Sequence, residues 1–201
     1  MNAQNTNDIH WSENMIIVDA DYLDQVAFDL IVNFERIIGR KIPRADMAHW
    51  IDCVALDGGI REGDHETQVI LLHQKGSLKL ENFQPAKYED ELTGMAFRDS
   101  LGEFIFTSFP VENVVSKDDY IIDILNTVIA QKDIQRVMVI PNADEGDIYD
   151  KIRGALHYLE DDTKRITVFS MQPMQGGNFH QEILGYSLMS ALGIKADEIK
   201  E

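Results

Sequence analysis

Short apolar runs alternate along the chain with segments of helical spacing, and this alternation constrains the fold most. Residues 15–18 and 137–140 are apolar runs of the length of a buried strand. Val26, Leu30 and Phe34 recur at helical spacing after the first run. Strands that alternate with helices form a mainly parallel sheet joined by right-handed crossovers. We therefore predict a three-layer α/β/α sandwich with about five core strands in the order 3-2-1-4-5.

The same patterns predict where the individual elements lie. We expect strands at residues 15–18, 67–73, 137–140 and 166–169, and helices over residues 26–38, 43–57, 116–129, 148–159 and 178–192. Within residues 76–110, two apolar stretches flank the turn sequence Asp99-Ser100-Leu101-Gly102, which indicates an antiparallel hairpin inserted in the fold or added at a sheet edge. We expect a disordered polar tail over residues 1–13 and a single domain over residues 14–201.

The charge balance restricts the partners of the chain. Its 201 residues include 18 Lys and Arg against 35 Asp and Glu, a formal net charge of −17. Such a surface repels phosphate backbones and attracts basic proteins. No apolar run approaches the roughly 20 residues that span a membrane, and the N-terminus lacks the pattern of a signal peptide. With a lone cysteine, Cys53, expected to be a buried structural thiol, we expect a cytoplasmic protein that has no membrane contact.

Acidic residues follow the predicted parallel strands. Asp19 and Asp21 come directly after the first strand, and Asp144 follows the 137–140 strand. Asp119 and Asp123 lie one turn apart on the helix between these strands. Ligand sites in such sheets lie beyond the carboxyl ends of the strands, and carboxylates that converge there suit Mg²⁺ or Mn²⁺. Each acid also has a structural alternative as a helix cap or a turn residue.

Four segments resemble a known family. Ile16-Ile17-Val18-Asp19-Ala20-Asp21-Tyr22-Leu23 resembles the opening of PIN-domain and NYN-domain proteins. Residues 117–123, followed by residues 137–144, are similar to the acidic helix and late strand of a NYN domain, and residues 165–169 to its last strand. The resemblance implies a divalent-metal site with Asp19 as central ligand, supported by Asp119 or Asp123 and by Asp144. It also implies RNA hydrolysis, with Asp19 and Asp144 as the catalytic residues.

The sequence is also compatible with three other functions. Asn142-Ala143 replaces the Ser-Gly that this family places before the late Asp, so a non-catalytic relative is one alternative. A second is a phosphatase similar to haloacid dehalogenases, in which Asp19 is the nucleophile, Asp21 the acid/base and Lys151 the phosphate clamp. A third is a non-enzymatic interaction module that recruits a basic protein partner.

Overall fold

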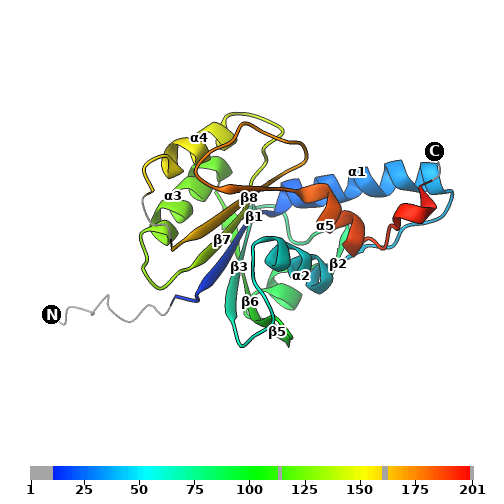
Figure 1. Ribbon diagram of the computed structural model, residues 1–201. Coiled ribbons are helices and arrows are strands. Elements are labelled where there is room, and N and C mark those ends of the chain that lie inside the picture. Colours follow the sequence, from blue (N-terminus) through cyan, green and yellow to red (C-terminus); the bar gives the residue numbers. More distant parts are fainter. Residues whose placement is uncertain (1–10, 113–114, 160–162, 200–201) are drawn as a thin grey trace.

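The first strand, β1 (Asn14–Asp19), lies at the centre of the sheet, and all six of its residues are buried. The computed structural model describes residues 11–112, 115–159 and 163–199 (Figure 1). Of the predicted polar tail, residues 1–10 lie outside this range, whereas Ser12 is buried and its hydroxyl donates to the Glu66 carboxylate. β1 pairs in parallel with a strand on each side. A strand enclosed on both edges and both faces needs the apolar run that the sequence provides.

The main sheet has seven strands in the order β5-β6-β3-β1-β7-β8-β9. Besides β1, these are β3 (Glu66–Gln74), β5 (Ala96–Asp99), β6 (Gly102–Val111), β7 (Arg136–Ile140), β8 (Arg165–Ser170) and β9 (His180–Ile183). When the first five parallel strands are numbered along the chain, their order is 3-2-1-4-5, which confirms the prediction. A separate two-stranded sheet joins β2 (Ala45–Asp46) to β4 (Phe83–Gln84).

The predicted hairpin is present, and one of its strands belongs to the core of the sheet. β5 and β6 pair antiparallel on either side of the predicted turn. β6 continues past this pairing and runs parallel to β3 over nine residue pairs. The antiparallel addition is therefore the short edge strand β5 alone.

The prediction of a helix from residue 178 is wrong at its start. Residues His180–Ile183 form β9, which pairs in parallel with β8, and the helix α5 (Leu184–Ala191) begins only afterwards. Backbone pairing with the open edge of β8 decides the conformation of these four residues, because strand formation depends more on neighbours than on local preference.

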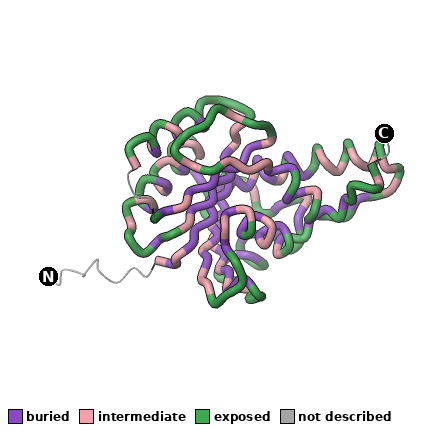
Figure 2. Tube along the Cα trace, in the orientation of Figure 1, coloured by how far each residue is buried: buried purple, intermediate pink, exposed green. Residues whose placement is uncertain are grey.

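Helices cover both faces of the sheet and so create two cores. α1 (Ala20–Ile38), α2 (Met47–Asp57) and α5 lie on one face, and α3 (Lys117–Ile129) and α4 (Ile148–Leu156) lie on the other (Figure 1). Alternate residues of β1 serve the two cores: Ile16 and Val18 pack with the first group of helices, and Met15 and Ile17 with the second. The buried residues run through the middle of the molecule (Figure 2). This is the predicted three-layer sandwich.

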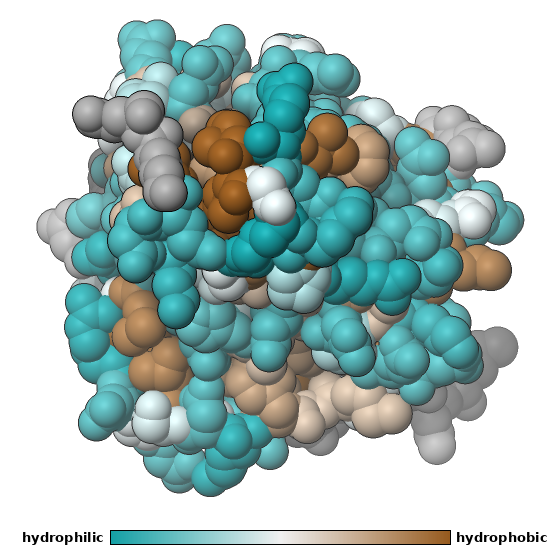
Figure 3. Space-filling model, turned by 90° about the vertical axis from the view of Figure 1, so that its right-hand side faces the viewer, coloured by the Kyte–Doolittle hydropathy of each residue, from teal (hydrophilic) through white to brown (hydrophobic). Residues whose placement is uncertain are grey.

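The end of the molecule that carries the C-terminal half of α1 has a mainly hydrophilic surface with small separate groups of hydrophobic side chains (Figure 3). Exposed apolar residues of α1 include Phe28, Val32 and Ile37. In the part of the chain that the structure describes, no helix has the length and apolar character needed to cross a membrane.

An acidic contact joins α2 to the hairpin. Asp52 of α2 faces Asp99, the last residue of β5, and lies near Asp46. Burial, followed by the hydrogen bond to Asp99, raises the pKa of Asp52 from 3.8 to about 7. Asp52 therefore keeps its proton in the folded chain at pH values where the unfolded chain has lost it.

This contact makes stability depend on pH. The folded-state pKa of Asp52 is the higher one, so its contribution is complete below pH 3.8 and is lost as the pH rises toward 7. Between pH 5 and pH 8, we expect the free energy of unfolding to fall by about 1–2 kcal/mol less in Asp52→Asn than in the wild type. This value allows for the partial exposure of Asp52. Urea unfolding at pH 5 and pH 8 measures this difference, and Glu89→Gln, which changes an exposed acid, is the control. Equal falls in wild type and Asp52→Asn would contradict the account.

Candidate functional site

The candidate site lies where the strand order reverses. The chain leaves β1 toward β3 on one side, and β7 pairs with the other side of β1. In parallel sheets, a crevice for ligands opens at the carboxyl ends of the strands at this point. Asp19 ends β1, Gln74 ends β3 and Asn142 follows β7.

Asp19 is buried at the end of β1, with 2% of its surface exposed. It is the N-cap of α1, and its Oδ1 accepts a hydrogen bond of 3.0 Å from the backbone N–H of Tyr22. A carboxylate at this position stabilises the unpaired N–H groups and the positive end of the helix dipole. The cap alone leaves a buried negative charge that needs a cation.

The ammonium group of Lys117 provides that cation. Its Nζ lies 2.6 Å from Oδ1 of Asp19 and 2.7 Å from Oδ2 of Asp21. The Asp21 oxygen also accepts from the backbone N–H of Gln74 at 2.8 Å, so the network ties β1, α1, β3 and α3 together. Burial opposes the charge of Lys117, but the two aspartates outweigh it and raise its pKa above the ordinary value. Lys117 therefore stays protonated at neutral pH.

Asp144 joins the site through a tyrosine. The hydroxyl of Tyr22 donates to Oδ2 of Asp144 at 2.7 Å. Burial, followed by this bond to Asp144, raises the pKa of Tyr22, so the hydroxyl keeps its proton and remains a donor. Tyr22 thus links Asp144 to the beginning of α1, where Asp19 forms the cap.

The other two predicted ligands lie elsewhere. Oδ1 of Asp119 is 3.3 Å from Nζ of Lys151 on α4. Its pKa is lowered, first by the hydrogen bond with Ser116 and then by Lys151. Asp123 is exposed and lines a separate groove between α3 and the sheet. Of the four predicted acids, Asp19 and Asp144 are therefore brought to the strand ends, and Asp119 and Asp123 are not among the residues that line the pocket there.

A lysine ammonium, rather than an open set of carboxylates, lies at the centre of this arrangement. In residues 11–112, 115–159 and 163–199, no group of three His, Cys, Asp or Glu side chains is placed to hold one. The Lys117 ammonium already bonds to both acids that follow β1. Lys151, expected to be the phosphate clamp of a phosphatase, instead pairs with Asp119 and Asp147.

A pocket of about 370 Å³ opens beside this network. Lys117, Asn142 and four acids are among the residues that line it. The acids are Asp21, Asp29, Asp144 and Glu145. Oδ1 of Asn142 is buried and accepts no hydrogen bond from the described residues.

The roles of Lys117 and Tyr22 were not predicted from the sequence. A lysine in the first turn of a helix lies at the positive end of the helix dipole, which is unfavourable for a cation. This unusual position is the one sequence feature that could have indicated an acidic partner for Lys117.

Removal of the Lys117 charge tests this network. We expect Lys117→Met to lower the free energy of unfolding by about 2–4 kcal/mol, because Asp19 is left buried without its cation. Adding Asp19→Asn restores at least half of the loss, since Asn also caps helices. Urea denaturation at pH 7 measures both. The control is Lys75→Met, which breaks an exposed pair with Glu112; a loss no larger than the control's would show that the network contributes little.

Comparison with known proteins places the chain in a family. No curated protein and no solved structure matches it. A family model with the description "Family of unknown function (DUF6621)" matches residues 8–199. The match spans the described fold and the acidic site, and the chain belongs to this family, DUF6621.

Proposed function

We propose that this chain is a PIN/NYN-like domain that has become a non-enzymatic interaction module and binds a basic side chain of a partner protein in the pocket beside Asp144. The observation that carries this proposal is the position of Lys117. Its ammonium lies at 2.6 and 2.7 Å from Asp19 and Asp21, where the resemblance would require a divalent ion. The chain thereby neutralises its own acidic centre.

The rest of the pocket remains negative. Lys117 is the one cation that lines the pocket among the described residues, and two acids already hold it. Asp144 accepts from a neutral tyrosine, and Glu145 has no ion pair in the described part of the chain. With a net charge of −17 around it, the pocket attracts a cation.

The acceptors suit a guanidinium group. Arg carries five N–H donors in a planar fork and binds carboxylates through paired hydrogen bonds. Asp144 and Glu145 offer carboxylate oxygens, and Oδ1 of Asn142 offers a buried acceptor that has no partner among the described residues. A buried acceptor left unpaired costs about 1–3 kcal/mol, so a donor from a ligand would recover this cost.

The two hydrolase alternatives have less support. An RNA substrate would meet a pocket lined by four acids on a strongly acidic protein, and phosphate binding needs basic contacts. A phosphatase nucleophile has to reach its substrate, whereas Asp19 is 2% exposed and its Oδ1 already accepts from Tyr22 and Lys117.

Calorimetric titration with a short peptide tests the proposal. The probe is acetyl-Gly-Arg-Gly-amide, and its matched control is the same peptide with citrulline, which keeps the shape and removes the charge. We expect the Arg peptide to bind at least about tenfold more tightly, with an affinity that falls as salt rises. Asp144→Asn combined with Glu145→Gln should abolish the preference, and the exposed Glu62→Gln should not.

Two results would contradict the proposal. One is equal binding, or no binding, of the two peptides at millimolar concentration. The other is hydrolysis of single-stranded RNA or of a phosphomonoester that requires Mn²⁺ and is lost in Asp19→Asn, because it would restore the enzyme alternatives.

A further inference from the structure

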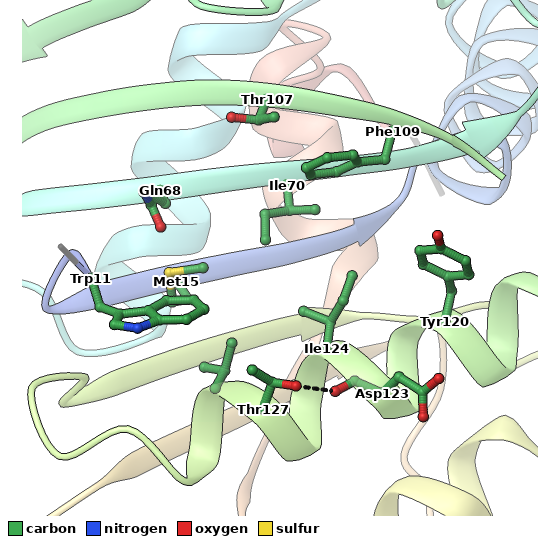
Figure 4. Close-up of a pocket in the computed structure, with 11 residues that line it drawn as sticks. Trp11, Met15, Gln68, Ile70, Thr107, Phe109, Tyr120, Asp123, Ile124 and Thr127 are labelled. Atoms are coloured by element: carbon green, nitrogen blue, oxygen red, sulfur yellow. Dashed lines mark hydrogen bonds between the residues drawn. The ribbon is translucent and has the colours of Figure 1, made fainter. Parts of the chain in front are cut away.

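A second pocket, of about 450 Å³, lies along α3. It is a groove between this helix and the face of β1, β3 and β6 (Figure 4). Side chains of β3 and β6 that face it are half-buried or exposed, such as Ile70, Thr107 and Phe109, the last with 44% of its surface exposed. None of the residues that line it lines the pocket beside Asp144.

The walls of the groove are mainly apolar, with Gln68, Thr107 and Thr127 as uncharged polar members. Met15, Ile70 and Phe109 come from the strands, and Ile124 and Val128 come from α3. Trp11 lies toward one end and Tyr120 toward the other (Figure 4). The stretch of α3 from Tyr120 to Val128 measures about 12 Å at 1.5 Å per residue. This length and volume fit a small organic molecule better than a protein surface.

One charged side chain lines this apolar groove among the described residues, and it is acidic. Asp123 lies on α3 toward the same end as Tyr120 (Figure 4). No Lys, Arg or His of the described residues lines the groove or forms an ion pair with Asp123. Asp119, one turn earlier on the same helix, pairs with Lys151. The unpaired Asp123 therefore gives the apolar groove a negative end.

We propose that this groove binds a small organic amine with an apolar body. The body lies along Met15, Ile70 and Phe109, and the ammonium group lies near the carboxylate of Asp123. The ring of Tyr120 adds a favourable surface for a cation. The net charge of −17 favours the amine over an acid of the same shape. This proposal does not depend on the function proposed for the other pocket.

The two tryptophans of the chain provide the assay. Trp11 lines the groove, whereas Trp50 is fully buried in the core on the opposite face of the sheet. Each gives one indole N–H signal in a ¹H–¹⁵N NMR spectrum, and Trp11→Phe assigns them. The probes are hexylamine, hexanoate and 1-hexanol, which share the apolar chain and differ in charge.

We expect hexylamine to shift the Trp11 signal to saturation and to leave the Trp50 signal unchanged. Hexanoate should need at least about tenfold higher concentration, because it places a negative charge beside Asp123. Asp123→Asn should lower the affinity for hexylamine to that for 1-hexanol, and Phe109→Ser should weaken all three. The control Asp133→Asn removes an exposed acid outside the groove and should change nothing.

The outcomes separate clearly. Equal affinity for the three probes would overturn the role of Asp123 and leave a general apolar groove. A Trp11 signal that does not saturate with any probe, or a Trp50 signal that moves equally, would overturn the site itself. Loss of arginine-peptide binding at the other pocket would leave this result unaffected.

Discussion

The ion pairs between Lys117 and the two aspartates at the end of β1 hold together the edge of the sheet where the candidate site lies. Asp19 is buried at the end of the central strand, and a charge at that depth requires a partner. Lys117 reaches it from the first turn of α3, on the opposite face from α1. The same ammonium holds Asp21, which also accepts the Gln74 N–H at the end of β3. One side chain therefore connects both helical layers to neighbouring strands of the sheet.

This internal cation changes what the acidic strand ends can do. A metal-dependent hydrolase needs carboxylates that stay free to bind the ion and a water. Here the first two carboxylates bind an ammonium group. Asp144 is held by the Tyr22 hydroxyl, and Asp119 of α3 pairs with Lys151. What remains is an acidic pocket on an acidic protein, and on this basis we propose recognition of a cation rather than attack on a phosphate.

The layers and the strand order could be predicted because they depend on local patterns. The run 15–18 and the run 137–140 are apolar throughout, so each had to be a buried strand, and the crossover rules left few arrangements. β9 could not be predicted, since residues 180–183 become a strand through pairing with the edge of β8. At the site, the position of Asp19 could be predicted because it directly follows an apolar strand. The contact with Lys117 joins positions 98 residues apart, and no local pattern reports such a pairing.

The central claim is that Lys117 stands in the place of a divalent ion, and a calorimetric Mn²⁺ titration of three folded proteins tests it most directly. These are the wild type, Lys117→Ala and the double variant Asp19→Asn/Lys117→Ala, each checked by circular dichroism, and Asp19→Asn is titrated beside them as the reference. The account predicts no saturable heat for the wild type at millimolar Mn²⁺. It predicts binding by Lys117→Ala, which leaves two unbalanced carboxylates, and loss of that binding in the double variant. Tight Mn²⁺ binding by the wild type that disappears in Asp19→Asn would contradict it and point to a metal-dependent enzyme.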